Sequence, residues 1–443
     1  MSKPALFEAV FRHQKEHRVS FHTPGHKCAE ELCSINFCHL DVTELPDTDS
    51  LFEASGPILQ AEQDTARVFG AKGAFYSAGG CTLCIQAMFR LCAPSGGKVI
   101  CGRTIHRSAL CAMALLGITP VWVWPVQDAG EGLPGRISPA DVKRALKETP
   151  DAHGVYVTSP DYYGVMSDIG AISQTCREAG VPLMVDNAHG SHLKFVGGDM
   201  HPITLGADMA ACSVHKTLPV LTGGAVLLIN DERYLANAKD AMALFGSTSP
   251  SYPIMVSIDM MSHWAEDCAA DAFAALTCEV FKLKQLALER GMSLPGGVCD
   301  PVRLTLNTAR IGLKGHEAAE FLRKKGIDAE YSDGCHVVLL PTPFNRIGDF
   351  GRLGEALRGL PVSAPLPVSA ALPPRPPVRC TPREAMLLPW ETVSVKEAAG
   401  RVAAAVQCPC PPGVPVVMPG EEITPRGAEF FVKYGISVVK VLK

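Results

Sequence analysis

Short apolar segments alternate with helix-length segments between residues 73 and 229, and this alternation constrains the fold more than any other feature of the chain. Stretches such as Cys81–Cys92, Arg107–Leu116 and Ile169–Ala179 have the apolar spacing of amphipathic helices. Such alternation is typical of an α/β fold with a largely parallel sheet covered on both faces. The expected strands are Gly73–Tyr76, Lys98–Cys101, Pro120–Trp124, Gly154–Thr158, Pro182–Val185, Asp208–Ser213 and Gly224–Ile229.

Other patterns flank this region. Residues 1–55 resemble a partly helical arm that leads into a loop of small, polar and acidic residues. After about residue 295 the pattern is mixed, with strands expected at 304–309 and 336–341 and a helix over Lys314–Lys325. The segment Leu360–Pro382 has too many prolines for a central strand or a helix, so it is either a linker or, as we favour, an extended connection within a smaller domain. We therefore predict an N-terminal arm (1–55), a large domain (56–295) and a smaller α+β C-terminal domain (296–443).

The composition excludes several classes of protein. With 443 residues, 47% of them hydrophobic, the chain can bury a large core, and disorder is excluded as its main character. The net charge is −4, from 41 basic and 45 acidic residues, which argues against a nucleic-acid binder. The most apolar windows are too short and too interrupted to span a membrane. The N-terminus does not resemble a signal peptide, and seventeen cysteines without framework spacing favour reduced thiols in a cytoplasmic protein.

A pair of glycines follows the first expected strand, in the segment SAGGCT (77–82). A strand-to-helix turn of this kind lets backbone N–H groups converge on an anion at the positive end of the helix. Short glycine motifs give many false positives, and Gly79 and Gly80 more often form nothing more than a tight turn. At this point a phosphate-binding turn is one of two interpretations.

Two chemically versatile residues stand at the ends of later expected strands. Asp186 follows the apolar run Pro182–Val185, and Lys216 comes 30 positions later, just after the expected strand Asp208–Ser213. In doubly wound sheets, ligands gather at the carboxyl ends of the strands. A lysine in such a dry site loses its proton readily and can form a Schiff base. The pair therefore suggests an aldehyde cofactor bound through a lysine imine, with a carboxylate on its ring nitrogen.

Simpler interpretations apply to the same residues. A single aspartate such as Asp186 is more often a cap of the next element, and a lysine near a strand end is usually a solvated charge. A metal site is also conceivable, because Asp186, His189 and His192 could supply one carboxylate and two imidazoles. No further ligand cluster completes such a site, so we predict no metal.

Several segments, in the same order and over nearly the whole chain, resemble the ornithine/lysine/arginine decarboxylases. These enzymes use pyridoxal 5′-phosphate (PLP) and have the aspartate-aminotransferase fold, known as fold type I. SVHKTL and STSPSYP together are the most specific part of the likeness, and the chain resembles the short form of the family, which lacks the N-terminal wing domain. The matching segments are FHTPGHK (21–27), GRTIHRS (102–108), TSPDYYGV (158–165), VDNAHGSH (185–192), SVHKTL (213–218), STSPSYP (247–253) and PPGVPVVMPGE (411–421).

The resemblance implies a role for each candidate residue. Lys216 would bind PLP covalently, and Asp186 would contact the pyridinium nitrogen. The ring would lie between Ala188 and His106, with His189 beside it. The residues that would hold the phosphate end of the cofactor are Gly79, Gly80, Cys81, Thr82, Ser213 and His215. Ser247 and Thr248 resemble the loop that reaches the cofactor of a neighbouring subunit, which implies a homodimer with shared sites.

The reaction that the resemblance implies is decarboxylation of lysine, arginine or ornithine to CO2 and a di- or polyamine. The distal cation of such a substrate needs an anionic or polar pocket. The acidic residues available for it are Asp161, Glu330, Asp333 and Glu421, each of which is also a plausible surface or capping residue.

The sequence departs from the family at a few positions. Many relatives carry hydroxyl side chains where this chain has Gly80 and Cys81, an acid where it has Asn187, and Thr or Ser where it has Asp161. Two alternatives therefore stay open. One is another fold-type-I PLP enzyme, such as an aldolase, a lyase or a transaminase. The other is a PLP-binding paralogue without turnover, an interpretation motivated by Ala78 and Asn187.

Overall fold

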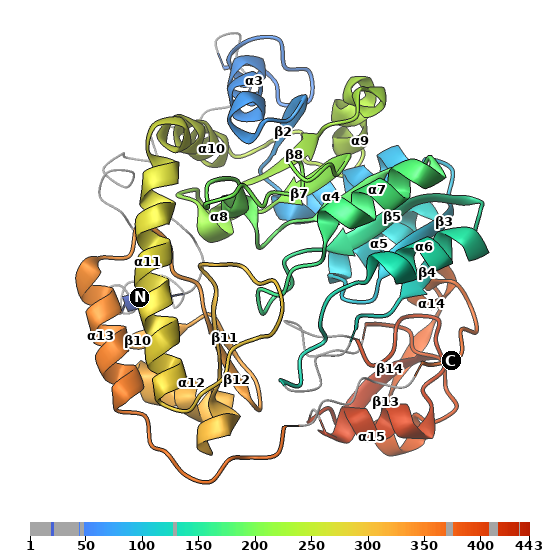
Figure 1. The fold of residues 1–443 in the computed structure, drawn as a ribbon. Helices are drawn as coiled ribbons and strands as arrows, with labels where there is room; N and C mark the ends of the chain where they lie inside the picture. The colour runs from blue at the N-terminus through green and yellow to red at the C-terminus, as the bar shows by residue number, and fades with distance from the viewer. Residues whose placement is uncertain are drawn as a thin grey trace, which may run out of the picture.

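A central seven-stranded sheet organises the computed structural model, which describes residues 19–21, 44, 48–126, 131–368, 375–406, 415–433 and 435–443 (Figure 1). Each of the seven expected strands is present. In chain order they are β2 (Gly73–Ser77), β3 (Gly97–Gly102), β4 (Ile118–Val123), β5 (Ala152–Thr158), β6 (Leu183–Asp186), β7 (Met209–Cys212) and β8 (Ala225–Ile229). Their spatial order is β2-β8-β7-β6-β5-β3-β4.

The sheet is mostly parallel, as predicted. Strand β8 runs antiparallel to both of its neighbours, β2 and β7, whereas all other neighbouring strands are parallel. Parallel strands β5, β6 and β7 therefore end at the same edge of the sheet. This arrangement brings the residues that follow them together in space.

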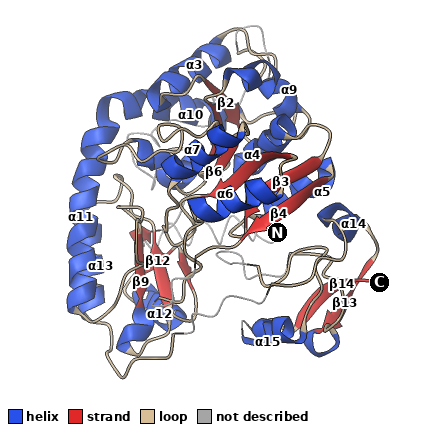
Figure 2. Cartoon of the chain, turned by 45° about the vertical axis from the view of Figure 1, so that its right-hand side comes forward, coloured by secondary structure: helices blue, strands red, loops and turns tan. Residues whose placement is uncertain are grey.

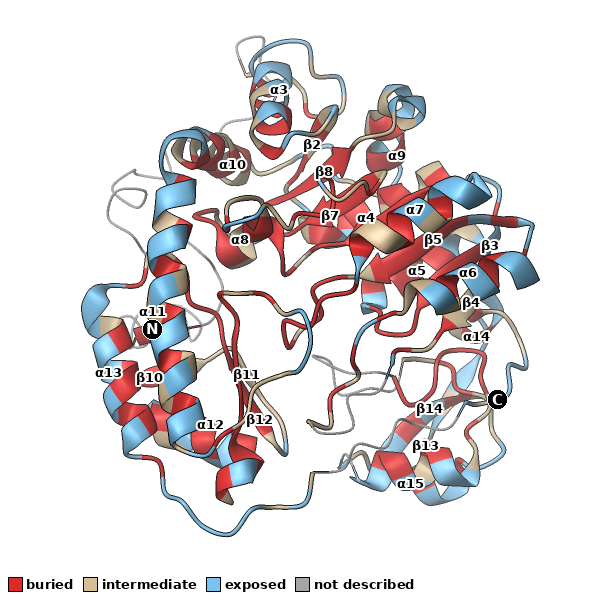
Figure 3. Ribbon diagram, in the orientation of Figure 1, coloured by how far each residue is buried: buried red, intermediate tan, exposed pale blue. Residues whose placement is uncertain are grey.

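Helices cover both faces of the sheet because side chains in its strands alternate between two apolar clusters. Tyr156 of β5 packs on one face against Phe89, with ring centroids 4.9 Å apart, whereas Val155 and Val157 point to the other face. The first face is covered by α4 (Gly80–Cys92), α5 (Arg107–Leu116) and α9 (Ala238–Ala243), and the second by α6 (Pro139–Glu148) and α7 (Ile169–Ala179). Figure 3 shows β7 and β8 as buried and the outer sides of α6 and α7 as exposed.

Three further helices extend this core beyond strand β2. Helix α3 (Pro57–Phe69) packs on β2 and on α10 (Tyr252–Trp264). After a five-residue π-helical segment, Ala265–Ala269, the chain continues into the long helix α11 (Ala270–Glu289). Helix α11 runs from the region of the central sheet down to the residues after 295, so it connects the large unit with the small one (Figure 1).

The residues after 295 first form a small unit beside α11. Its sheet is antiparallel, in the order β11 (Tyr331–Ser332), β12 (His336–Leu339), β9 (Leu304–Asn307). Helices α12 (Gly315–Lys324) and α13 (Ile347–Arg358) pack around it, and β1 (Val19–Phe21) pairs in parallel with β10 (Ile327–Ala329). The strands expected near 304 and 336 and the helix expected over 314–325 are therefore present.

A separate unit ends the chain, and Figure 2 shows its strands apart from the central sheet and from the sheet of β9 and β12. It contains β13 (Trp390–Ser394), α15 (Pro425–Lys433) and β14 (Val438–Leu442), with β13 and β14 antiparallel, whereas the preceding α14 (Pro382–Leu387) packs on α5. The described residues of the proline-rich segment, 361–368 and 375–381, lie outside helices and sheets and lead from the small unit to this one. The domain boundaries at 55 and 295 stay predictions, and most of the expected N-terminal arm lies outside the described residues.

A buried ion pair ties the last unit to the central sheet. The Arg103 guanidinium, which is completely buried after strand β3, donates two hydrogen bonds to the Glu421 carboxylate, one of them 2.8 Å long. The same guanidinium lies over the rings of Trp122 and Trp124, at 5.4 and 4.4 Å from their centroids. Such a pair is held strongly in place, since a buried charge without its partner is costly.

Candidate active site

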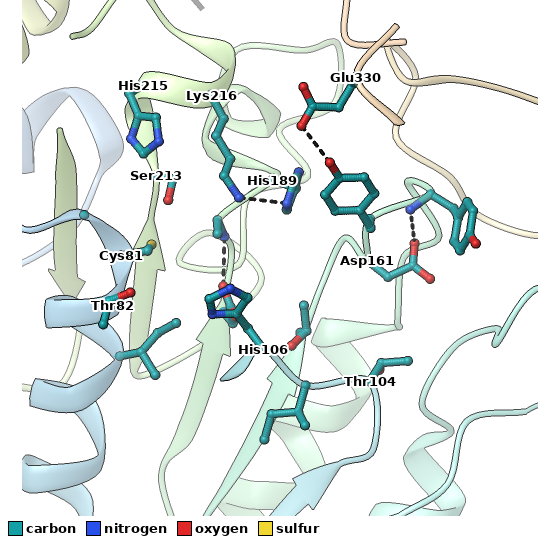
Figure 4. Close-up of a pocket in the computed structure, with 18 of the residues that line it drawn as sticks. Cys81, Thr82, Thr104, His106, Asp161, His189, Ser213, His215, Lys216 and Glu330 are labelled. Atoms are coloured by element: carbon teal, nitrogen blue, oxygen red, sulfur yellow. Dashed lines mark hydrogen bonds between the residues drawn. The ribbon is translucent and has the colours of Figure 1, made fainter. Parts of the chain in front are cut away.

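A cavity of about 480 Å³ lies at the carboxyl edge of the central sheet. Its walls come from the large unit and, through Glu330, from the small unit. Figure 4 shows Lys216 and His106 pointing into the same space, with Cys81, Thr82 and Ser213 on one side and Asp161 and Glu330 on the other. The residues that line the cavity are Gly80, Cys81, Thr82, Ile85, Thr104, Ile105, His106, Pro134, Thr158, Asp161, Tyr162, Tyr163, Asp186, Ala188, His189, Ser213, His215, Lys216 and Glu330.

Strand ends position the functional side chains. Asp186 is the last residue of β6, and Lys216 lies in the short helix α8 (Val214–Thr217) that follows β7. His106 follows β3 and caps α5, and the first turn of α4 follows β2. Because β5, β6 and β7 are parallel and end at the same edge, residues that are far apart in the sequence form one wall of the cavity.

Ten of the thirteen predicted site residues line this cavity: Gly80, Cys81, Thr82, His106, Asp186, Ala188, His189, Ser213, His215 and Lys216. The other three do not. Gly79 caps α4, and its N–H donates to the Ser77 hydroxyl at 3.1 Å. Ser247 and Thr248 are exposed to solvent in the single chain. The roles assigned to all thirteen residues stay predictions.

Lys216 is held against a histidine. Its Nζ lies 2.8 Å from His189 Nε2, and burial lowers the pKa of the Lys216 amine. Burial, together with the nearby Lys216 charge, also lowers the pKa of His189 well below its ordinary value. The Tyr162 ring packs edge-on against the His189 ring, with centroids 4.7 Å apart. The lowered pKa of Lys216 favours the neutral amine, which is the form that attacks a carbonyl.

Asp186 is a buried carboxylate that receives only neutral donors in the described part of the chain. Its Oδ1 accepts the Ala188 N–H at 3.1 Å, and its Oδ2 accepts the Tyr156 hydroxyl at 3.1 Å. The side chain is 2% exposed, and no lysine, arginine or histidine of the described residues forms an ion pair with it. Buried charges are normally paired, so this carboxylate is suited to a cationic ligand in the cavity.

His106 is oriented by its own helix. Its Nδ1 accepts the backbone N–H of Ser108 at 3.2 Å and lies 2.8 Å from the Ser108 hydroxyl. A neutral imidazole that accepts at Nδ1 carries its proton on Nε2. The ring is therefore fixed at the N-terminus of α5, over the space in front of Lys216 (Figure 4).

The side of the cavity near α4 has the character of an anion site. Cys81 and Thr82 lie in the first turn of α4, where backbone N–H groups have no carbonyl partner within the helix. Gly80 has a φ of 69°, which favours glycine, and a Cβ built there would meet no atom of the described residues within 4 Å. The Gly80 N–H itself donates to Gly223 O at 2.8 Å, so it is not available to a ligand.

His215 and Cys81 complete this side. The His215 Nδ1–H donates to Gly224 O at 2.7 Å, which leaves Nε2 as the second ring nitrogen for contacts. Burial raises the pKa of the Cys81 thiol well above its ordinary value, so the thiol stays neutral. A neutral thiol beside the first turn of a helix does not repel an anion there.

The opposite side of the cavity is acidic. Glu330 is half-buried, and its Oε1 accepts the Tyr162 hydroxyl at 2.7 Å. Asp161 is buried, its Oδ1 accepts the N–H groups of Tyr163 and Val165 at 2.9 Å, and burial raises its pKa to about 7. Of the four acidic residues named for a distal cation, these two line the cavity.

The other two acids are engaged elsewhere. Asp333 accepts a hydrogen bond from the Tyr163 hydroxyl and contacts His336, and Glu421 is paired with Arg103. Neither lines the cavity.

The metal alternative receives no support from the described residues. Among them, no three His, Cys, Asp or Glu side chains are grouped as metal ligands. His192 turns away from Asp186 and His189: its Nε2 lies 2.9 Å from Asp300 Oδ1, and its ring stacks on Phe273.

The cavity fits the PLP that the resemblance implies. No cation of the described residues is paired with the buried Asp186 carboxylate, as the site of a pyridinium nitrogen requires, and Lys216 supplies an amine in the same cavity. At the anion side, the first turn of α4 and the open space beside Gly80 suit a phosphate. The donor set thus matches the three polar features of the cofactor: its ring nitrogen, its aldehyde and its phosphate.

Sequence reasoning missed Tyr156 and Arg303. Tyr156 stands in the middle of strand β5, and a buried tyrosine hydroxyl needs a partner, which is Asp186 here. Arg303 directly precedes the apolar strand β9, and a charge at such a position signals a buried contact. Neither signal says which residue the side chain will meet.

Comparisons with known proteins agree with this geometry. Residues 4–275 match the family model "Orn/Lys/Arg decarboxylase, major domain", and residues 375–435 match "Orn/Lys/Arg decarboxylase, C-terminal domain". The chain is 30% identical to an arginine decarboxylase of Bacillus subtilis (strain 168), over 97% of this chain and 93% of the relative.

Solved structures share the fold. The constitutive lysine decarboxylase of Escherichia coli superposes with a TM-score of 0.74 at 20% identity, over 100% of this chain and 82% of the other. A serine palmitoyltransferase of Sphingomonas wittichii superposes with a TM-score of 0.60 at 14% identity, over 77% of this chain and 85% of the other. The fold class predicted from the sequence, fold type I, is thereby confirmed. Because the major-domain model spans more than half of its length, the chain belongs to the Orn/Lys/Arg decarboxylase family.

Proposed function

We propose that this protein is a PLP-dependent decarboxylase that converts a basic amino acid to the corresponding amine and CO2, and that arginine is the preferred substrate. The single observation that supports the proposal best is the convergence of Lys216, Asp186 and His106 in one cavity of a family member. The arginine decarboxylase of B. subtilis is the basis for naming arginine before lysine and ornithine.

When bound, PLP supplies an electron-accepting ring for the bond between Cα and the carboxylate. Asp186 would hold a proton on the ring nitrogen, because its buried carboxylate has no other cation to neutralise among the described residues. His106 and Ala188 would fix the plane of the ring. Lys216 Nζ and His189 Nε2, 2.8 Å apart, would exchange the proton that Cα needs after CO2 leaves.

Glu330 is the acid that we assign to the distal cation of the substrate. It lines the cavity on the side away from α4, and Tyr162 orients its carboxylate. Asp161 has one carboxylate oxygen engaged by two backbone N–H groups and holds a turn, so its contribution would be mainly structural. Glu330→Gln should raise KM for arginine at least tenfold and change kcat much less, whereas an equal loss in kcat and kcat/KM would contradict the assignment.

The direct test is a substrate screen with purified protein loaded with PLP. Released CO2 and the amine product are measured for arginine, lysine and ornithine, with Lys216→Ala as the control. Amine without keto acid supports decarboxylation, and keto acid or an aldehyde product would point to another fold-type-I reaction. Turnover that survives in Lys216→Ala would refute the mechanism, and a cofactor absorbance band without any turnover would favour the silent paralogue.

A homodimer with shared sites belongs to this proposal. Ser247 and Thr248 are exposed in the single chain and lie outside its own cavity, as expected for residues that serve a neighbouring subunit. Light scattering tests the dimer. Mixing Lys216→Ala with Thr248→Ala subunits, each expected to have low activity alone, tests the sharing, because a mixed dimer would regain one intact site.

The compartment is also proposed to be the cytoplasm. All twelve described cysteines are free thiols, as expected in a reducing environment. No helix among the described residues has the length and apolar character needed to cross a membrane.

A further inference from the structure

A buried arginine stands behind the histidine that contacts Lys216. Arg303 is 3% exposed and directly precedes strand β9, so it reaches the site from the small unit. Its Nη2 donates to His189 O at 3.0 Å, and its Nη1 donates to Tyr162 O at 3.0 Å. The guanidinium thus clamps the backbones of two segments that form the cavity wall.

The same guanidinium also meets the His189 ring. Arg303 Nη1 lies 3.4 Å from His189 Nδ1, and the other ring nitrogen, Nε2, lies 2.8 Å from Lys216 Nζ. A guanidinium has five N–H donors and no acceptor, and it does not lose its proton in proteins. Nδ1 must therefore be the acceptor in this contact, and a neutral imidazole then carries its proton on Nε2.

The direction of the next hydrogen bond follows from this tautomer. An Nε2–H facing Lys216 can only donate, so the amine must present its lone pair, which only the neutral amine has. We propose that Arg303 is a positioning residue that fixes the proton of His189 on Nε2, so that His189 donates to the free amine of Lys216 and holds it in the neutral, nucleophilic state. The role of the amine rests on the proposed function, but the hydrogen-bond geometry does not.

Arg303 itself is held by Asp300. Arg303 Nε lies 3.6 Å from Asp300 Oδ2, and the other oxygen of this carboxylate lies 2.9 Å from His192 Nε2. His192, a candidate metal ligand in the sequence analysis, instead contacts the carboxylate that pairs with Arg303. Charged and titratable groups from every neighbouring element surround the Lys216 amine. They are Cys81 of α4, His106 before α5, Asp186 at the end of β6, His189 after β6, His215 of α8, Arg303 before β9 and Glu330 after β10.

The first experiment reads the tautomer directly. Apoprotein labelled with 15N-histidine is examined by long-range 1H–15N NMR, with the His189 signals identified by their loss in His189→Phe. We expect an unprotonated Nδ1 and a protonated Nε2 in the wild type. Arg303→Met should shift His189 toward the Nδ1–H form, and Arg303→Lys, which keeps a cationic donor, should restore part of the wild-type pattern. A protonated Nδ1 in the wild type, or an unchanged tautomer in Arg303→Met, would overturn the proposal.

The second experiment reads the amine. Lys216 of the apoprotein is labelled with an acylating reagent as a function of pH, and the modified peptide is quantified by mass spectrometry. Arg303→Met should slow labelling at pH 8 about tenfold, which corresponds to an upward shift of about one unit in the labelling midpoint. In the His189→Phe background the same substitution should have a much smaller effect, because the path through the imidazole is gone. An equal effect in both backgrounds would mean that Arg303 acts on Lys216 by its charge alone.

A control separates positioning from folding. Arg290 is a half-buried arginine at the end of α11 that donates to Leu360 O at 2.8 Å, far along the chain from the Lys216 segment. Arg290→Met should leave both the tautomer and the labelling midpoint unchanged. If Arg303→Met does not fold, Arg303→Lys and His189→Phe still test the proposal. A wild-type tautomer as expected, with no turnover on any basic amino acid, would refute the proposed function and leave this inference standing.

Discussion

Replacing Asp186 by asparagine should reduce turnover without disturbing the fold. In the structure, Asp186 Oδ1 accepts the Ala188 N–H and Oδ2 accepts the Tyr156 hydroxyl, both at 3.1 Å. An asparagine can keep both contacts, because its carbonyl can face the Ala188 N–H and its NH2 can donate to the Tyr156 oxygen. The substitution therefore removes the negative charge and little else.

The size of the effect follows from the charge that is lost. A hydrogen bond to a charged group contributes about 1.5–3 kcal/mol, and each 1.36 kcal/mol corresponds to a tenfold change in rate. We expect kcat of Asp186→Asn to fall roughly tenfold to a hundredfold. The assay is CO2 release at saturating substrate and cofactor, with cofactor affinity measured separately by fluorescence.

Tyr156→Phe is the matched control. It removes the tyrosine hydroxyl and leaves the negative charge that faces the ring nitrogen, so kcat should fall less than in Asp186→Asn. If Asp186→Asn kept kcat within twofold of the wild type, or lost less than Tyr156→Phe, the role assigned to the carboxylate would be wrong.

Three further expectations concern stability. Burial raises the pKa of Asp161 to about 7 from 3.8, so between about pH 4 and 7 the folded protein holds a proton that the unfolded chain has released, and stability falls as the pH rises through that window. Asp161→Asn should therefore raise Tm more at pH 8 than at pH 5. Equal shifts in Tm at the two pH values would contradict this. Arg103→Met leaves the Glu421 carboxylate buried without its partner and should lower the free energy of unfolding, measured by urea titration, by about 3–5 kcal/mol. The double variant Arg103→Met/Glu421→Leu should regain most of this lost free energy. Gly80→Ala should cost about 1 kcal/mol through its φ of 69° alone, and Gly197→Ala, which has equal space and no such φ, should cost less.

Much of the large unit could be predicted because hydrophobic periodicity encodes strands and helices locally. The expected helices Arg107–Leu116 and Ile169–Ala179 coincide with α5 and α7, and each expected strand overlaps an observed one. The convergence of Lys216 and Asp186 also followed from the sequence, because parallel strands end at one edge whatever the details of packing.

Other features depend on contacts between distant segments, which periodicity does not encode. The antiparallel direction of β8 depends on how the chain turns through α8. The apolar pattern of a strand does not indicate whether it runs parallel or antiparallel to its neighbours. The contact of Arg303 with His189 joins the small unit to the large one. The separate sheet of β13 and β14 was likewise not visible in the composition after residue 295.

The pairing of Arg103 with Glu421 has a consequence for how such chains can diverge. Arg103 immediately precedes Thr104, Ile105 and His106, which form part of the cavity wall, whereas Glu421 belongs to the terminal unit. A chimera whose terminal unit had no acid at position 421 would leave the buried Arg103 charge behind the wall without its partner. Positions 103 and 421 are therefore expected to change together over evolutionary time, although more than 300 residues separate them.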